Sequence, residues 1–366
     1  MGQDFRIGII GLGGVADAHL SAYRELQQVR VVSVCDLREE VARSTALRLS
    51  ANAYTDYRAL LSDGGLDLAL VLTPASTHRE IVEAVAQAGI HVLCEKPLAL
   101  SLADGHAMAD ACRLAGVKLF YGSCYRYLPA VQKAYELIRA GAIGRLVLMS
   151  EQIIGGGGEA AYRELGPVHY PVGGLGGHGM GLVDHGVHLI DVFSWLAGAP
   201  PQRVVGSGQI AGAAAQTEYM IMSFPNGATG QLLYNGATFS TTLPNEGLFS
   251  GGQGWLVDGA LSQTGGWEAE PGSISIHGTE GSMRVFHYAN ALYLKDRDGQ
   301  RRIELEGRPA FGHFATQLED CMDAIANNRA PTVGAREGIQ ALSALTSIYS
   351  DNISRADVSA LRQEPS

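Results

Sequence analysis

Short apolar runs alternate with helical patterns along the first third of the chain. Five runs rich in β-branched residues have the length of strands, at residues 5–10, 29–35, 66–72, 90–94 and 118–121. The segments between them carry Ala, Leu, Glu and Arg at helical spacing, at residues 14–27, 38–50, 76–88 and 101–115. Strands that alternate with helices predict a doubly wound parallel α/β sheet with helices on both faces.

The pattern changes after about residue 124. Helical spacing is found at residues 128–140, 181–197, 311–327 and 337–350. Strand-like runs joined by turns lie at residues 145–154, 202–210, 216–224, 228–235, 273–277, 282–287 and 291–295. We therefore predict two domains, residues 1–124 and 125–366, the second of α+β type with a large, mainly antiparallel open sheet. Residues 236–272 are rich in Gly, Ser and Thr and would suit a lid.

Composition and charge narrow the class of protein. The 366 residues are 46% hydrophobic and 17% charged, which is typical of globular domains. The net charge is −10 without any Lys/Arg block, so we exclude nucleic acid and anionic membranes as main partners. No apolar run reaches the roughly 18 residues of a membrane helix, and the five cysteines form no C-x-x-C pair. We expect a soluble, cytoplasmic protein with reduced, mostly buried thiols.

A glycine-rich stretch follows the first predicted strand and opens a predicted helix. Gly11-Leu12-Gly13-Gly14-Val15-Ala16 matches G-x-G-x-x-A. The first Gly permits a tight turn, the second lets backbone approach a pyrophosphate, and the Ala lets the helix pack on the strand. In this context we predict a dinucleotide cradle; the alternative is a glycine turn without a ligand.

The end of the second strand indicates which dinucleotide is bound. Asp36 closes that strand 20 residues past Ala16, with Leu37 beside it. A carboxylate at this place accepts hydrogen bonds from ribose hydroxyls and repels a 2′-phosphate, which favours NAD over NADP. Arg38, two residues after Asp36, would soften that preference.

Two further strands end in polar loops at the same edge of the predicted sheet. Thr73, Pro74, Ser76 and His78 follow one strand, and we expect this loop to contact the cofactor. A helix cap by Ser76 or Thr77 is the alternative. Glu95 and Lys96 follow the next strand, where Pro97 restricts the chain and a lysine can face a substrate oxygen. Glu95 would pair with the lysine or hold a backbone group. Taken alone, this stretch is better explained by a solvated Lys–Glu pair.

The predicted helix at residues 181–197 carries a polar stripe on an apolar background. Asp184, His188 and Asp191 lie at i, i+4 and i+7 and share one face. Buried carboxylates need partners, and His is the natural proton acceptor near neutral pH. We interpret the stripe as an acid–base site. A core histidine and a zinc site are the alternatives, but Asp184 and His188 supply only two ligands, so we predict no metal.

Together these motifs resemble the Gfo/Idh/MocA family, which is named for glucose–fructose oxidoreductase and inositol dehydrogenase. The resemblance covers essentially the whole chain. It also rests on Arg126-x-x-Pro129, on Ile276 with Gly278-Thr279-Glu280-Gly281, and on residues 324–328 with Pro331. It implies an N-terminal Rossmann domain that binds NAD and a C-terminal domain that binds substrate and forms oligomers. It also implies a cis Lys96–Pro97 bond and places the family's catalytic Lys, Asp and His on Lys96, Asp184 and His188.

Departures from the family pattern surround the expected substrate pocket and leave the substrate open. Residue 185 is His where the family usually has an apolar residue or Thr. As pocket candidates we select Tyr125, Arg126, Tyr170 and His178, besides Lys96, Asp184 and His188, because they carry hydrogen-bonding groups near the motifs.

We predict an NAD-dependent dehydrogenase that oxidises a secondary hydroxyl of a sugar, glycoside or cyclitol, as a homo-oligomer (dimer or tetramer). His188 takes the hydroxyl proton, Lys96 steadies the developing alkoxide, and Asp184 orients the substrate or the imidazole. One alternative is an NAD-dependent glycoside hydrolase that oxidises the sugar transiently, because Tyr170-Pro171 and His178-Gly179 loosely echo such enzymes. The other is an NAD-binding sensor, which competent residues at the catalytic positions disfavour.

Overall fold

The computed structural model describes residues 4–156, 181–208, 217–239, 273–287, 289–307 and 309–350. The chain divides into two compact units. The first comprises Met1–Tyr127 and Pro309–Leu342, and the second comprises Leu128–Arg308 and Ser343–Ser366. The domain border predicted from the sequence lies at 124/125, with all later residues in the second domain, whereas the contacts of residues 309–342 group them with the first unit. What each domain binds stays a prediction.

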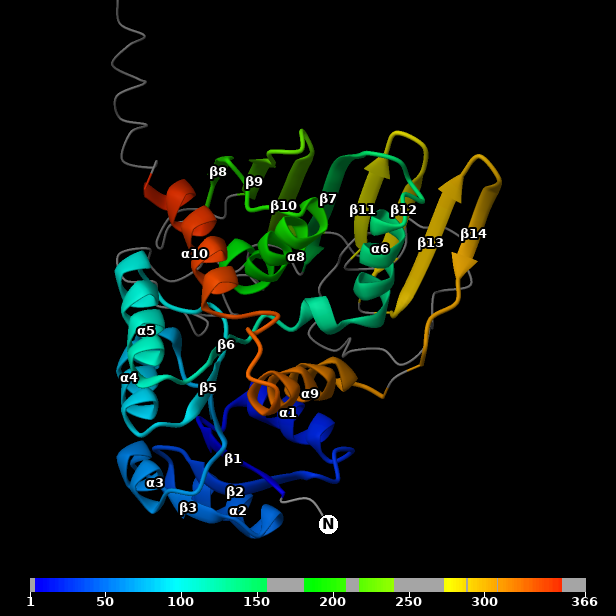
Figure 1. The fold of residues 1–366 in the computed structure, drawn as a ribbon. Helices are drawn as coiled ribbons and strands as arrows, with labels where there is room; N and C mark the ends of the chain where they lie inside the picture. Colours follow the sequence, from blue (N-terminus) through cyan, green and yellow to red (C-terminus); the bar gives the residue numbers. More distant parts are fainter. Residues whose placement is uncertain are drawn as a thin grey trace, which may run out of the picture. The chain divides into compact units, whose positions relative to one another are not determined.

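The first unit is built on a six-stranded parallel sheet (Figure 1). Its strands are β1 (Phe5–Ile10), β2 (Val29–Cys35), β3 (Asn52–Tyr54), β4 (Leu68–Val71), β5 (His91–Cys94) and β6 (Leu119–Tyr121). The order β3-β2-β1-β4-β5-β6 is that of a Rossmann fold and confirms the predicted sheet. It reverses between β1 and β4, and in such sheets ligands bind beyond the carboxyl ends of the strands at this switch point.

Helices connect these strands. They are α1 (Gly14–Tyr23), α2 (Glu39–Leu49), α3 (Tyr57–Asp63), the 3₁₀ turn η1 (Ala75–Thr77), α4 (His78–Gln87) and α5 (Leu102–Ala115). The ends of α5 follow from local chemistry: the Ser101 hydroxyl accepts a hydrogen bond from the Asp104 N–H (3.1 Å), and Gly116 ends the helix at φ +70°. The short elements β3 and α3 were not predicted.

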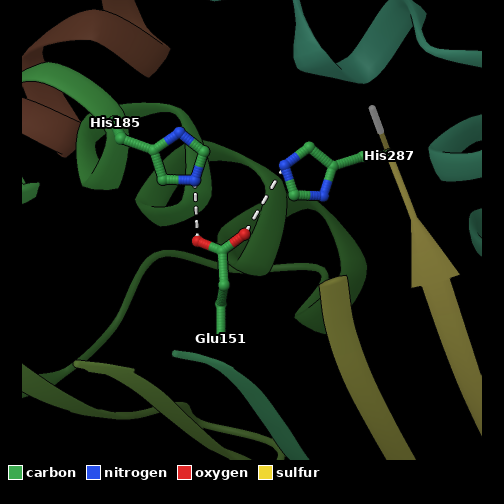
Figure 2. Close-up of side chains that lie close together, drawn as sticks. All are labelled: Glu151, His185 and His287. Atoms are coloured by element: carbon green, nitrogen blue, oxygen red, sulfur yellow. Dashed lines mark hydrogen bonds and ion pairs between the residues drawn. The ribbon is translucent and has the colours of Figure 1, made fainter. Parts of the chain in front are cut away.

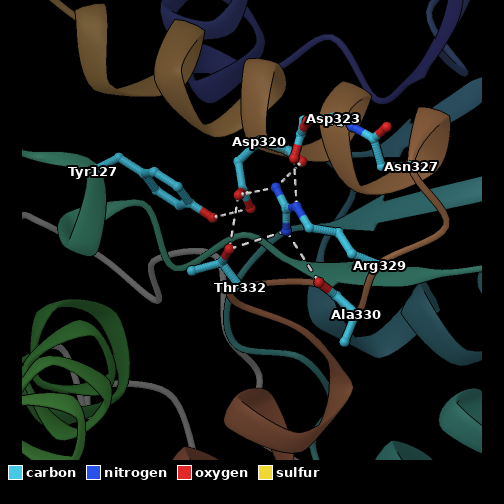
Figure 3. Close-up of polar contacts among 7 residues, drawn as sticks. All are labelled: Tyr127, Asp320, Asp323, Asn327, Arg329, Ala330 and Thr332. Atoms are coloured by element: carbon cyan, nitrogen blue, oxygen red, sulfur yellow. Dashed lines mark hydrogen bonds and ion pairs between the residues drawn. The ribbon is translucent and has the colours of Figure 1, made fainter.

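A late segment of the chain returns to the first unit. Helix α9 (Gly312–Ala326) packs against α1, where the rings of Phe314 and His19 lie 4.3 Å apart. Beyond α9, Arg329 forms an ion pair with Asp320, which also accepts hydrogen bonds from Tyr127 (2.8 Å) and Thr332 (2.7 Å) (Figure 3). This polar network and the apolar contact of α9 explain why residues 309–342 belong to the first unit.

The second unit contains an eight-stranded sheet with the order β14-β13-β12-β11-β7-β10-β9-β8. Its strands are β7 (Leu146–Gly156), β8 (Arg203–Ser207), β9 (Glu218–Ser223), β10 (Thr229–Phe239), β11 (Ser273–Gly278), β12 (Ser282–Phe286), β13 (Ala291–Asp296) and β14 (Gly299–Ile303). All neighbours are antiparallel except β7 and β10, so the predicted large, mainly antiparallel sheet is confirmed. The edge strand β14 was not predicted.

Helices α6 (Pro129–Arg139) and α8 (Val187–Ala197) lie on one face of this sheet (Figure 1). Met149, Gly230 and Met222 are paired neighbours on three adjacent strands and point to this face. Helix α8 covers them, because a Cβ at Gly230 would lie 2.9 Å from the ring of Phe193. On the opposite face Val205 pairs with Ile221, and both are exposed. Exposed apolar side chains of this kind would be covered in the expected oligomer, but self-association stays a prediction.

The burial of the cysteines and the lengths of the helices bear on the predictions about thiols and membranes. All five cysteines lie in the described part of the chain as buried, free thiols, as predicted. Burial raises the pKa of Cys35 to about 11 and that of Cys112 to about 12, so these thiols are unreactive near neutral pH. Within the described ranges, none of the helices has the length and apolar character that crossing a bilayer requires. The last helix, α10 (Ala335–Ser350), ends the described chain.

Candidate active site

The turn after β1 leaves open space where the sequence predicts a pyrophosphate. Gly11 has φ +94°, and a Cβ there would lie 2.8 Å from the backbone carbon of Leu72, so the turn requires glycine. A Cβ on Gly13 or Gly14 would meet nothing within 4 Å. Helix α1 begins at Gly14, and no side chain caps its N-terminus. Exposed backbone N–H groups at an uncapped helix start fit the phosphates of a dinucleotide.

Asp36 is held firmly at the end of β2. Its Oδ2 accepts a hydrogen bond from the Leu12 N–H (3.0 Å), and its Oδ1 accepts from the backbone N–H (2.9 Å) and the Nε–H (2.9 Å) of Arg38. The Arg38 side-chain hydrogen bonds are the main reason that the pKa of Asp36 lies below its ordinary value. Arg38 thus forms an ion pair with the Asp36 carboxylate. This is the residue that was predicted to weaken the preference of Asp36 for NAD over NADP. Leu37, beside Asp36, is 91% exposed.

A buried histidine contacts the loop that follows β4. His78 is fully buried, and its ring nitrogens lie 2.8 Å from the Thr73 carbonyl oxygen and 3.1 Å from that of Leu98. Burial lowers the pKa of His78. The two contacts of its ring hold the loop in position, and contact of this loop with a cofactor stays a prediction. Pro74 and Ser76 are exposed. Thr77 precedes α4 but forms no side-chain cap, so the alternative of a Thr77 helix cap is wrong.

Glu95 forms a buried polar chain that the sequence did not reveal. It is 6% exposed, and its Oε2 accepts a hydrogen bond from the Lys96 backbone N–H (3.0 Å). Its Oε1 lies 3.0 Å from Nε2 of His19 on α1, and Nδ1 of His19 lies 2.7 Å from the Tyr23 hydroxyl. Glu95 therefore orients the backbone at Lys96, which is one of the two roles predicted for it. The Lys96–Pro97 bond is cis, as the resemblance implies.

The predicted helix at residues 181–197 has two parts. A π-helical segment, Gly181–Gly186, precedes α8, so the expectation of one uninterrupted α-helix over residues 181–197 is wrong. That Asp184 and His188 share one face stays a prediction. The segment packs closely on β10: a Cβ on Gly181 would lie 2.5 Å from Cβ of Tyr234. His188 is 5% exposed and Asp191 is 2% exposed, and both belong to α8. Asp184 is half-buried in the π-helical segment.

The predicted pocket residues fall into two groups. Tyr125 and Arg126 lie in a buried 3₁₀ turn, η2 (Tyr125–Tyr127). Tyr170 and His178 lie outside the described residues, as does most of the predicted lid, because β10 extends to Phe239 and residues 240–272 are not described. Lys96 belongs to the first unit, whereas Asp184 and His188 belong to the second, and each is described within its own unit.

Two family models match the chain. One, described as an oxidoreductase family with an NAD-binding Rossmann fold, matches residues 5–123, and the other, its C-terminal alpha/beta domain, matches residues 136–355. The chain belongs to the Gfo/Idh/MocA oxidoreductase family. The likeness stated from the motifs is therefore confirmed, together with a nicotinamide cofactor as the kind of ligand that the first domain of this family binds.

Similar Gfo/Idh/MocA proteins have different substrates. A D-apiose dehydrogenase of Paraburkholderia graminis is 39% identical over 38% of this chain. A myo-inositol 2-dehydrogenase of Thermotoga maritima is 29% identical over 62% of it. The alignments span 38% and 66% of these relatives' lengths. A 2,7-anhydro-N-acetylneuraminate hydratase of Escherichia coli is 28% identical over 84% of this chain and 79% of its own length.

Proposed function

We propose that this protein is an NAD-dependent dehydrogenase that oxidises a secondary hydroxyl of a sugar, glycoside or cyclitol. The observation that carries the proposal is the open glycine cradle, with Asp36 fixed at the neighbouring strand end, at the switch point of a Gfo/Idh/MocA Rossmann sheet. The sugar and inositol dehydrogenases among the relatives supply the substrate class.

The roles proposed for the side chains follow from their chemistry. His188 removes the hydroxyl proton as general base, and Asp184 orients the substrate or the imidazole. The Lys96 ammonium stabilises the negative charge that develops on the substrate oxygen. Glu95 and His19 keep the Lys96 backbone in place through the 3.0 Å contacts described above. When bound, the nicotinamide accepts the hydride that leaves the same carbon.

A substrate panel tests this proposal. The purified chain is incubated with NAD and single sugars, methyl glycosides or inositols, and NADH absorbance is followed. With at least one member of the panel, we expect a keto product in an amount equal to the NADH formed. Oxidation of no member, despite measurable NAD binding, would count against a dehydrogenase of this substrate class.

The similarity to the hydratase supports a second candidate. In this case the chain would oxidise a sugar only transiently, eliminate or add a group, and return the hydride. Product analysis in the same panel separates the two functions, because the second candidate converts substrate without net NADH formation. A requirement for NAD in catalytic amount would identify it.

We expect Asp36→Ser to narrow the preference of the enzyme for NAD over NADP. Two like charges about 4 Å apart repel by about 1 kcal/mol in water and about 4 kcal/mol near a protein surface. Removing the carboxylate should therefore narrow the ratio of the kcat/KM values for NAD and NADP by a factor of roughly 5 or more. Arg38 would be released to bind the 2′-phosphate. Asp110→Ser, an exposed change on α5, is the control. A wild type that uses NADP as well as NAD would refute the preference.

A further inference from the structure

Three side chains from distant parts of the sequence meet on the helix-covered face of the eight-stranded sheet. Glu151 lies on β7, His185 lies in the π-helical segment, and His287 follows β12. Nε2 of His185 lies 2.8 Å from Oε2 of Glu151, and Nε2 of His287 lies 3.5 Å from Oε1. Figure 2 shows the two imidazoles on either side of the carboxylate, each directed at a different oxygen.

The cluster is buried and chemically suited to a cation. The side chains of Glu151 and His287 are fully buried, and that of His185 is 11% exposed. The Tyr234 hydroxyl donates a hydrogen bond to Oε2 of Glu151 (2.7 Å). Burial lowers the pKa of His287 to about 3. Burial alone would raise the pKa of Glu151, but its histidine and tyrosine neighbours keep it below the ordinary value.

A buried ion pair between Glu151 and His185 is the simpler explanation of the cluster, but it does not account for one feature. Oε1 of Glu151 is buried and accepts no hydrogen bond from the described part of the chain, although the imidazole of His287 approaches it. A buried carboxylate oxygen is costly unless a hydrogen bond or a cation satisfies it. An ion between the carboxylate and the two imidazoles would satisfy it.

The spacing of the three groups fits a small metal ion. One ligand atom from each residue can be chosen so that all three lie within 4.8 Å of one another. A tetrahedral ion with bonds of about 2.0–2.1 Å holds its ligand atoms about 3.3 Å apart, so side-chain shifts of about 1.5 Å or less would close the site. Two imidazoles and one carboxylate form a ligand set typical of Zn²⁺ in sites that keep a position open for water or another oxygen ligand.

We propose that Glu151, His185 and His287 bind one divalent transition-metal ion, in the first place Zn²⁺, with one coordination position left open. Tyr234 supports the carboxylate from outside the coordination shell. In the sequence only Asp184 and His188 stand out as candidate ligands, which is why the sequence alone predicts no metal. The site does not depend on the oxidation proposed above, since it rests on the second unit alone.

Zinc binding by the full-length chain tests the proposal without any substrate. Protein stripped with a chelator is titrated with Zn²⁺ against a chromophoric competitor, and bound metal is counted after gel filtration. We expect about one Zn²⁺ per chain and a Tm that rises with Zn²⁺ concentration. Loading with Co²⁺ should give the visible absorption bands of a site with nitrogen and oxygen ligands. Failure of the wild-type chain to retain Zn²⁺ or Co²⁺ would overturn the proposal.

Variants locate the ion. His185→Asn, His287→Asn and Glu151→Gln should each abolish stoichiometric binding, and Tyr234→Phe should weaken it by about 10- to 100-fold. His277→Asn is the matched control, because His277 is an exposed histidine on β11 of the same sheet. Circular dichroism identifies any variant that fails to fold, and the wild-type Co²⁺ spectrum tests the ligand type independently of the variants. One Zn²⁺ retained by all three folded ligand variants would place the ion elsewhere and refute the site.

Discussion

Replacing His188 by Asn should lower kcat by a factor of about 10² to 10⁴, the usual contribution of a general base, and leave NAD affinity close to wild type. His188 lies in α8 of the second unit, whereas the glycine cradle and Asp36 belong to the first. The change therefore touches none of the residues proposed to hold the dinucleotide. Steady-state kinetics with the best substrate of the panel, together with NAD titration by fluorescence, would measure the two effects separately.

The pH profile adds a readout that a structural role would not change. If His188 is the base, protonating it abolishes turnover and sets the acid limb of the kcat profile. In His188→Asn no group remains there to protonate, so the acid limb should flatten. His106→Asn, at an exposed position on α5, is the control and should behave as wild type. Near-normal turnover of a folded His188→Asn protein would mean that this 5% exposed side chain is a core residue.

The regular elements could be predicted because their hydrophobic periods are strong. Strands β1 and β2 have the predicted bounds, α5 begins one residue later than predicted, and α9 is one residue shorter at each end. The elements that were missed are short or polar. Strand β3 has three residues, β14 reads GQRRI and is mostly exposed, and α3 is a seven-residue helix capped by Asp56, whose carboxylate accepts from the Arg58 N–H (2.9 Å). Segments this short or polar have a weak hydrophobic period, so their sequence does not distinguish them from turns.

The site could be predicted only where its chemistry is local in sequence. The cradle and Asp36 follow directly from strand ends and glycine spacing. The chain Glu95–His19 joins residues 76 positions apart, and Glu151 and His185 are 34 positions apart, so no local pattern marks these pairs. The π-helical turn at Asp184 is likewise set by tertiary contact, since glycines at 181 and 186 allow the backbone to pack against Tyr234. Its sequence alone reads as a continuous helix.

Replacing Lys96 by Met should cut kcat by about 10²- to 10³-fold, the typical cost of removing one group that stabilises a developing oxyanion. The backbone N–H of Lys96 donates to Glu95, and methionine keeps that donor and much of the apolar stem. The local structure should therefore survive, and the loss should report on the ammonium charge. Lys96→Arg retains the charge but places a planar guanidinium there, so it should recover little activity.

The Lys96 variant also separates electrostatic stabilisation from proton transfer. Since His188 remains, the acid limb of the pH profile should persist in Lys96→Met, at a lower plateau, whereas it flattens in His188→Asn. Lys118→Met, which removes a surface lysine hydrogen-bonded to Asn328, should leave kcat unchanged. If Lys96→Met instead raised only KM and left kcat intact, the lysine would bind the substrate equally in the ground and transition states. Its assignment to the stabilisation of the alkoxide would then be wrong.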